Sequence, residues 1–207
     1  MGQITAAARG GDSAQRILDI AERLMQVRGY NGFSYADIAE TMRLTKASLH
    51  YHFPSKAELG RRLMERYTEN FLTALGRIDD TSAGAYEKLQ RYVSIYSDVL
   101  ANKRMCLCGM LAAEYATLPK SVKVEVTRFF DANETWLSAV IENGKRSGWL
   151  KSSAPSIETA RTLISTLEGA MMLARTYDDI RRFERAAQGL LAVIAGPPFV
   201  PARKLPA

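Results

Sequence analysis

The chain has few of the residues and runs that mark disulfide-rich, metal-rich or membrane-spanning proteins. Among 207 residues there are two cysteines and two histidines. Cys106 and Cys108 lie too close together in sequence to build a disulfide framework, which fits a reducing compartment. No apolar run approaches the roughly 20 residues of a membrane helix. The first residues, MGQITAAARGGDS, hold no apolar stretch typical of a signal peptide. We therefore expect a cytoplasmic protein with no membrane partner.

The composition is that of an ordinary globular protein with a basic balance. Hydrophobic residues make up 47% and charged residues 24% of the chain. The formal net charge is +6, which is compatible with an anionic partner but does not require one. A chain of this length can bury a core as one domain or as two small ones.

Alternating strand patterns are scarce and helical periodicity is nearly continuous, which predicts an all-α fold of about nine helices. Hydroxyl residues suited to capping helices precede several of them: Ser34 with Asp37, Thr45, and Ser55 with Glu58. The predicted helices cover residues 12–28, 34–42, 45–53, 55 onward, 83–102, 104–117, 120–146, 156–176 and 179–195. The predicted domains are a flexible arm (1–11), a helix-turn-helix domain (12–60), a helical effector-binding and dimerisation domain (61–196) and a loose tail (197–207).

Both histidines fall in the segment LTKASLHYHFPSKAEL, residues 44–59. On a helix, His50 and His52 point roughly 200° apart, so they cannot share a metal ion, and no carboxylate lies beside them for acid–base catalysis. We therefore predict no metal, no cofactor and no enzymatic activity. Leu49 and Phe53 form the buried side, and the opposite arc is polar, aromatic and basic. That arc is either a solvated surface without a role or the outward face of a DNA-reading helix.

Two short capped helices joined by a tight turn favour the second interpretation, a helix-turn-helix unit. Thr45 and Ser48 near the helix N-terminus can donate to phosphate or base edges. His50 and Tyr51 can contact bases, and Lys46 can bind guanine or phosphate. The expected partner is double-stranded operator DNA.

Residues 13–59, SAQRILDIAERLMQVRGYNGFSYADIAETMRLTKASLHYHFPSKAEL, closely resemble the DNA-binding domain of the TetR family of transcriptional regulators. The resemblance implies an N-terminal helix-turn-helix domain joined by a long fourth helix to an all-helical ligand-binding domain. Arg43 departs from the family pattern, in which Gly is common in this turn, and a positive φ there would cost about 1 kcal/mol. By position, the resemblance implies contacts to DNA from Tyr35, Ala36, Thr45, Lys46, Ala47, Ser48, His50, Tyr51, His52 and Lys56.

The resemblance also implies an effector pocket for a small molecule of unknown identity in the second region. Plain core packing is the alternative for each apolar or aromatic candidate there. The candidates are Tyr92, Tyr96, Met105, Cys106, Met110, Phe129, Phe130, Trp136 and Met172. Cys106 raises a second possibility, because CLCGMLAAEYATLP resembles a helix of a TetR subgroup in which a cysteine reacts with electrophiles or oxidants. Lys103 and Arg104, near a helix start, would lower the pKa of such a thiol.

Operator recognition by this family implies a homodimer, since two recognition helices must meet two half-sites. Apolar stripes on the last two helices are the expected interface, although other helices of the same chain could cover them instead. The stripes consist of Leu163, Leu167, Ala170, Met171, Ala174, Leu190, Leu191, Val193 and Ile194. The sequence thus predicts a dimeric, ligand-responsive repressor. The alternatives are a thiol-responsive repressor acting through Cys106 and a helical small-molecule-binding protein with weak DNA binding.

Overall fold

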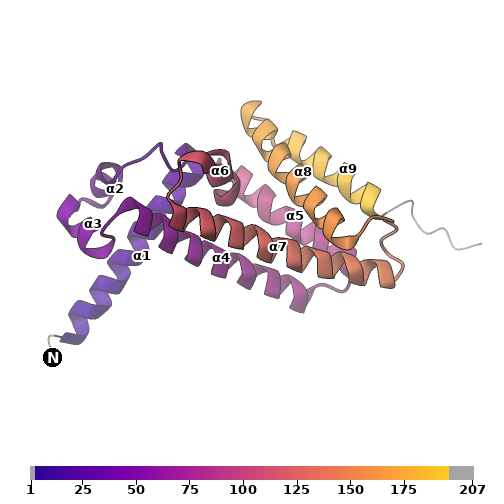
Figure 1. Cartoon of the computed structure of the whole chain (residues 1–207), viewed down its shortest axis with the longest axis horizontal. Coiled ribbons are helices and arrows are strands. Elements are labelled where there is room, and N and C mark those ends of the chain that lie inside the picture. Colours follow the sequence, from indigo (N-terminus) through magenta and orange to yellow (C-terminus); the bar gives the residue numbers. More distant parts are fainter. Residues whose placement is uncertain (1–2, 196–207) are drawn as a thin grey trace, which may run out of the picture. The chain divides into compact units, whose positions relative to one another are not determined.

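A computed structural model describes the backbone of residues 3–195 and the side chains of residues 13–195 (Figure 1). Within this range every regular element is a helix, which confirms the all-α prediction. The α-helices are α1 (Gln3–Arg28), α2 (Tyr35–Met42), α3 (Lys46–His52), α4 (Lys56–Thr81), α5 (Ala85–Ala101), α6 (Leu107–Ala113), α7 (Lys120–Arg146), α8 (Ser156–Thr176) and α9 (Ile180–Ala195), with one 3-10 helix, η1 (Tyr115–Thr117). Among the described residues, no helix combines the length and the apolar character needed to cross a membrane.

The N-terminal helix is longer than the sequence predicted. The first helix begins at Gln3 rather than near Asp12, so residues 3–11 are helical, whereas a flexible arm was expected over residues 1–11. The run Ala6–Ala8 favours this extension, because alanine has the highest helix propensity and offsets the glycines that follow. The tail predicted for residues 197–207 lies outside the described residues.

The chain forms two compact units. The first contains residues 1–77 and 98–133, and the second contains residues 78–97 and 134–207. The first unit therefore includes α1 to α3, most of α4, α6 and the first half of α7. The second contains most of α5, the rest of α7, and α8 and α9.

The capping residues predicted in the first unit occupy the expected positions. Ser34 forms a complete capping box with Asp37 at the start of α2, with the Ser34 amide donating to the Asp37 carboxylate at 2.7 Å. The Thr45 hydroxyl accepts from the Ser48 amide at 3.2 Å and caps α3. At α4 the Ser55 hydroxyl accepts from the Glu58 amide, while the Glu58 carboxylate binds Arg61 instead of completing a box.

Arg43 adopts the left-handed conformation in the turn between α2 and α3, with φ 55° and ψ 40°. Its amide donates to the Glu40 carbonyl, and the next amide, of Leu44, donates to the Ala39 carbonyl. These bonds satisfy the last carbonyls of α2, as a left-handed residue after a helix does. The turn therefore keeps the geometry that glycine would favour, and the strain expected for Arg43 is present.

In the second unit α8 packs against α9, and this contact corrects the predicted dimer interface. The residues of the stripes pack inside the chain because the two helices cover each other. Val193 is 77% exposed and Leu190 is half-buried. The other seven are buried within one chain: Leu163, Leu167, Ala170, Met171, Ala174, Leu191 and Ile194.

Candidate DNA-binding surface

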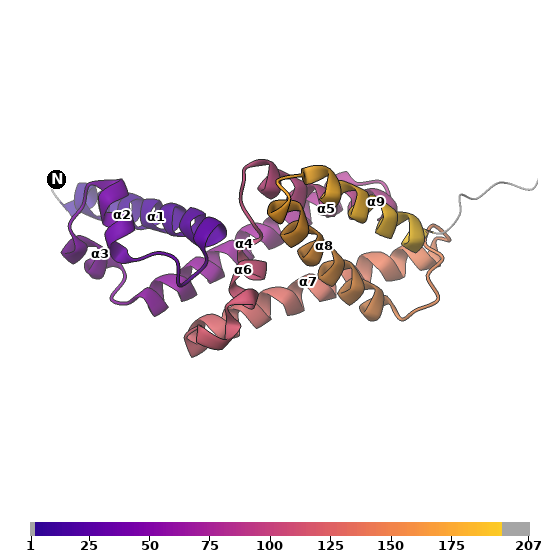
Figure 2. The same ribbon diagram turned by 90° about the horizontal axis from the view of Figure 1, so that it is seen from above.

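Helices α2 and α3 lie against each other and present α3 to the outside (Figure 2). Leu49 and Phe53 are 1% and 4% exposed, so the inward side of α3 is the one that periodicity predicted. Thr45, Lys46, Ala47, His50 and Tyr51 are exposed, and Ser48 and His52 are half-buried. The predicted outward face therefore exists as a continuous surface.

Tyr51 is the most exposed large hydrophobic side chain of this surface. Its relative exposure is 84%, and its only described ring contact is an edge-on contact with His52, at 5.3 Å between centroids. An aromatic ring left in water on a short helix has no packing role in the chain itself. Its chemistry suits contact with a thymine methyl group or a base edge.

His50 is exposed but oriented by two neighbours. Its ring lies 4.8 Å from the Tyr35 ring, and Nδ1 lies 3.2 Å from the Pro54 carbonyl oxygen. Because a carbonyl can only accept, Nδ1 carries the proton in this contact. In the neutral ring Nε2 is then an acceptor, suited to the amino groups of adenine or cytosine.

Tyr35 holds the junction between α3 and α4 together. Its hydroxyl donates to the Phe53 carbonyl at 2.8 Å. Burial, together with the nearby Tyr30 and Glu58, raises the pKa of Tyr35 to about 12, so the phenol stays protonated. The expected DNA contact from Tyr35 therefore has to come from the ring or from a lone pair of the hydroxyl. Ala36, next along the chain, is exposed.

Tyr35→Phe is expected to lower the free energy of unfolding by about 1 kcal/mol, because it removes a hydrogen-bond donor from a partly buried site. Between the ordinary tyrosine pKa of 10.0 and the folded value of about 12, the unfolded chain binds fewer protons than the folded one. The Tyr35 hydrogen bond therefore stabilises the wild type less as pH rises through this window. The difference in the free energy of unfolding between wild type and Tyr35→Phe becomes smaller as a result. Urea unfolding at pH 8 and at pH 11 measures both effects. Tyr51→Phe is the control. A difference in the free energy of unfolding between wild type and Tyr35→Phe that stays constant with pH would contradict the raised pKa of Tyr35.

Lys56, the first residue of α4, is engaged by the chain itself. Its ammonium lies 4.8 Å from the centre of the Tyr30 ring and 4.3 Å from that of Phe33, and donates to the Phe33 carbonyl. Burial lowers the pKa of Lys56, and the carboxylates of Glu114 and Asp37 oppose that shift. The remaining N–H groups can still bind a phosphate, but the side chain also ties α4 to the loop before α2.

A hollow of about 380 Å³ brings several of the predicted residues together. Its walls combine two ammonium groups, an imidazole and hydroxyls, and no carboxylate lines it, which suits a phosphate or a base edge. Phe33 and Ser34 complete it, although no pattern in the sequence indicates a role in binding for either residue. The lining residues are Phe33, Ser34, Tyr35, Ala36, Lys46, His50 and Lys56.

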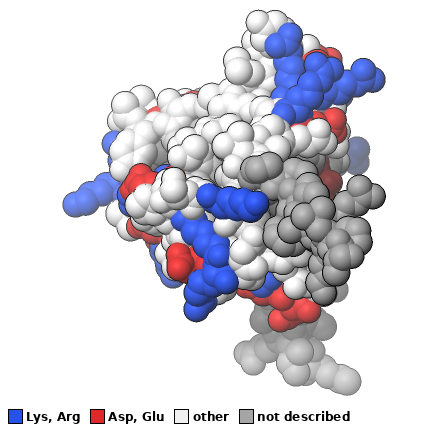
Figure 3. Space-filling view, turned by 90° about the vertical axis from the view of Figure 1, so that its right-hand side faces the viewer, with Lys and Arg blue, Asp and Glu red and all other residues white. Residues whose placement is uncertain are grey.

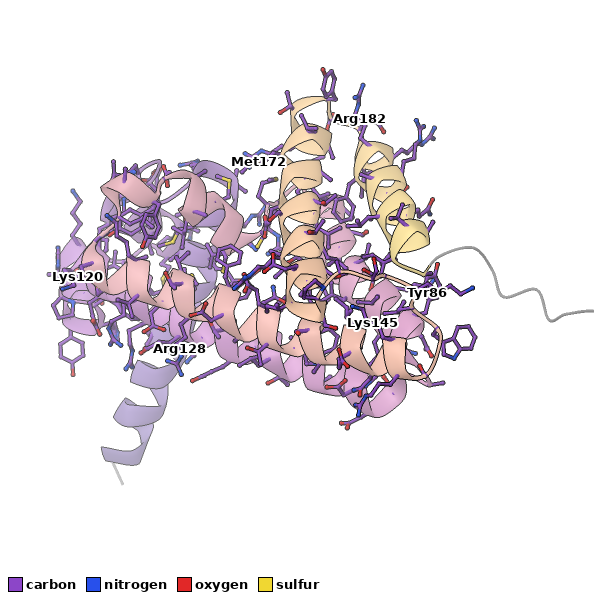
Figure 4. The ribbon with its side chains drawn as sticks, turned by 45° about the vertical axis from the view of Figure 1, so that its right-hand side comes forward. Tyr86, Lys120, Arg128, Lys145, Met172 and Arg182 are labelled. Carbon is purple, nitrogen blue, oxygen red and sulfur yellow. The ribbon has the colours of Figure 1, made fainter. Side chains whose placement is uncertain are left out.

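The residues predicted to line an effector pocket are divided between the two units. Met105, Cys106, Met110, Phe129 and Phe130 belong to the first unit. The others, Tyr92, Tyr96, Trp136 and Met172, belong to the second. Met172 is 43% exposed and projects from the surface of α8 (Figure 4), which places it outside any enclosed pocket.

Trp136, one of the predicted pocket residues, lines a groove of about 490 Å³ in the second unit. The indole N–H donates to Asp79 at 2.8 Å, and the Lys88 ammonium donates to the same carboxylate at 2.5 Å. Burial raises the pKa of Asp79, but these two bonds and the Lys88 charge outweigh it and leave the pKa below its ordinary value. The groove is lined by Asp79, Gly84, Ala85, Lys88, Trp136, Ala139, Val140, Asn143 and Ser147.

Cys106 occupies the N-cap position of α6 and is 4% exposed. Cys108 is fully buried, and both thiols lie near the Tyr67 hydroxyl, whose pKa is raised by burial and then by these neighbours. Arg104, expected to act on the thiol, donates to the Gln26 side chain at 3.2 Å. A closed environment of this kind favours the core-packing interpretation of Cys106.

Comparisons with known proteins agree with this architecture. Residues 17–63 match the family model "Bacterial regulatory proteins, tetR family", and residues 85–190 match "Tetracyclin repressor-like, C-terminal domain". A TetR family regulator from Agrobacterium tumefaciens has a solved structure with a TM-score of 0.87 and 31% identity, over 90% of this chain and 100% of that one. A TetR regulator from Legionella pneumophila gives a TM-score of 0.79 and 35% identity, over 86% and 95% of the two chains. The transcriptional repressor NemR of Escherichia coli K12 is 23% identical over 192 residues, 90% of this chain and 96% of its own.

Proposed function

Since the chain belongs to the TetR family of transcriptional regulators, and is thereby a DNA-binding regulator, we propose that it acts as a dimeric repressor that leaves its operator when a small molecule binds. The observation that carries the proposal is the outward face of α3, where an exposed aromatic ring, a lysine and an oriented histidine lie together. NemR, a relative over most of the chain, is itself described as a repressor. Release by a small molecule is typical of the family.

Selection from random double-stranded DNA, followed by a mobility-shift assay, tests the proposal. We expect an inverted repeat with half-sites about one helical turn apart, bound with strong salt dependence. Placed upstream of a reporter, the selected sequence should lower transcription. Weak binding without sequence preference would favour the alternative, a small-molecule-binding protein in which DNA binding is secondary.

In this proposal, phosphates and bases are contacted by different residues of the surface. Thr45, Lys56 and the first amides of α3 bind phosphates, since hydroxyl and amide donors at a helix N-terminus suit an anion. Lys46, Ser48, His50 and Tyr51 face the major groove. Tyr35 and Ala36, at the start of α2, contact the backbone beside it, and Ala47 and His52 complete the contact at the edges of α3.

We place the effector in the groove beside Trp136. The groove offers the Trp136 indole, the apolar side chains of Ala85 and Val140, and the polar groups of Asn143 and Ser147. Trp136 also stacks on the buried Tyr92, with ring centroids 5.8 Å apart, which joins the groove wall to the aromatic core of the second unit. A flat, mostly apolar molecule with one polar group fits this combination.

Ala139→Phe is expected to fill the groove and block the effector while leaving DNA binding intact. A compound that raises the Tm of wild type and releases its DNA should bind the variant at least tenfold more weakly, since the added ring occupies the ligand's volume. Gln90→Phe, which adds the same ring at an exposed position of α5, is the control. Ligand binding and release from the selected DNA are measured together. If the compound releases DNA from Ala139→Phe as readily as from wild type, the effector binds outside this groove.

The dimer surface that we propose is the outer side of the α8–α9 pair. Leu173 and Val193 are 59% and 77% exposed, and share their faces with Gly169 and Gly189, beside which a Cβ would meet open space. Small residues next to exposed apolar ones let two helices approach closely. Basic side chains gather at the tip where α8 meets α9 (Figure 3), which includes the exposed Arg181 and Arg182. The apolar stretch farther along the helices is therefore the part that a second copy would bury.

A further inference from the structure

The Glu114 carboxylate, at the end of α6, lies in the turn that follows α1, within the first unit. It accepts from the Tyr30 amide at 2.5 Å and from the Asn31 amide at 3.4 Å. The Asn31 side chain donates to the same carboxylate, and to the Thr117 hydroxyl at 2.7 Å. Successive backbone amides that point at one carboxylate form an anion site, which the chain fills with its own side chain.

Gly29 makes this approach possible in two ways. Its φ of 81° turns the chain at the end of α1, a conformation that glycine adopts without strain. A Cβ on Gly29 would lie 2.8 Å from the carboxyl carbon and from both carboxylate oxygens of Glu114. The turn therefore accepts the carboxylate because residue 29 has no side chain.

The same turn leads directly into the DNA-binding surface. Tyr30 and Phe33 are 6% and 5% exposed, and the Lys56 ammonium lies over both rings. Ser34 then caps α2, and Lys56 opens α4 just after α3. The position of the turn is thus linked to both ends of the α2–α3 pair through short, specific contacts.

We propose that Glu114 is a positioning residue for DNA binding: its carboxylate holds the turn of Gly29, Tyr30 and Asn31 where α2 and α3 fit an operator. Glu114 is joined through α6 to α5, and through η1 to α7, the helix that carries Trp136. This role rests on the proposed function, because it presupposes specific binding to an operator.

Loss of the carboxylate leaves two backbone amides without their charged acceptor and frees the turn. Hydrogen bonds to a charged group are roughly twice as strong as neutral ones, so the turn should become mobile while the core residues of α1 keep their packing. Specific DNA binding, which needs α3 in one orientation, should suffer more than non-specific binding, which depends on net charge.

The test compares Glu114→Ala with Arg104→Ala, which removes a different hydrogen bond between α1 and the segment before α6. We expect Glu114→Ala to bind the selected operator about tenfold more weakly or worse, with non-specific affinity within twofold of wild type. Hydrogen exchange at the amides of Tyr30 and Asn31 should speed up in this variant only. Sodium acetate in place of chloride, at equal ionic strength, should restore part of the affinity of Glu114→Ala by filling the vacated anion site.

The proposal is overturned if Arg104→Ala loses as much operator affinity as Glu114→Ala, or if acetate does not restore the affinity of Glu114→Ala. Either result would mean that Glu114 has only a packing role. If Glu114→Ala does not fold, the isosteric Glu114→Gln carries the test. A two- to fivefold loss of operator affinity with faster exchange at Tyr30 then supports the proposal, and wild-type affinity overturns it. A wild type that selects no DNA sequence would contradict the proposed function, whereas equal binding by wild type and variant contradicts only the role of Glu114.

Discussion

Val193→Glu is expected to convert the proposed dimer into folded monomers that bind the operator roughly 100-fold more weakly or worse. The reason is that a dimer engages its second half-site as an intramolecular event, whereas each monomer binds alone. A carboxylate at the centre of an apolar interface has no partner and would have to lose its water. Val193 is 77% exposed within one chain, so the substitution should leave the chain's own core intact.

Light scattering and a mobility-shift assay measure the two parts of this result. Val124→Glu, the same substitution at a valine that is 55% exposed on α7, is the matched control and should keep both the dimer and the DNA affinity. Leu167→Glu would be uninformative, because that residue is fully buried and its loss should unfold the second unit. A Val193→Glu protein that stays dimeric would place the interface elsewhere.

Tyr51→Ala and Lys46→Ala are each expected to cost about 1–3 kcal/mol of operator affinity, roughly 5- to 150-fold, with no loss of stability. Both side chains are exposed, so truncation leaves no cavity and no buried polar group. If Tyr51 and Lys46 contact bases, each substitution should lower affinity for the operator but not for non-specific DNA. Each should also relax the base preference at one position of each half-site.

Repeating the selection with each variant identifies the position that relaxes. Tyr86→Ala, a tyrosine of α5 that Figure 4 labels and that lies outside this surface, is the control and should bind as wild type does. An equal loss on specific and non-specific DNA would reassign Lys46 to a phosphate. Wild-type affinity in a folded Tyr51→Ala would remove Tyr51 from the interface.

Local features of the DNA-binding unit were predictable because their causes are local. Leu49 and Phe53 point inward because residues four apart share a face of a helix. Ser34 and Thr45 cap α2 and α3 because a hydroxyl at that position reaches amides two or three residues on. Both signals lie within a few residues of sequence, so no knowledge of distant contacts was needed.

Contacts between distant segments were decided by the tertiary structure alone. Periodicity marked Leu163 and Leu167 as an apolar face, but not whether α9 of the same chain or a second copy covers it. Lys56 was predicted to contact DNA, yet it also contacts two aromatic rings and a carbonyl more than twenty residues away in the chain. Glu114 had no signal in sequence spacing, because its partners, Tyr30 and Asn31, lie more than eighty residues earlier. Sequence period fixes which side of a helix is apolar, whereas the identity of its neighbour depends on how the whole chain packs.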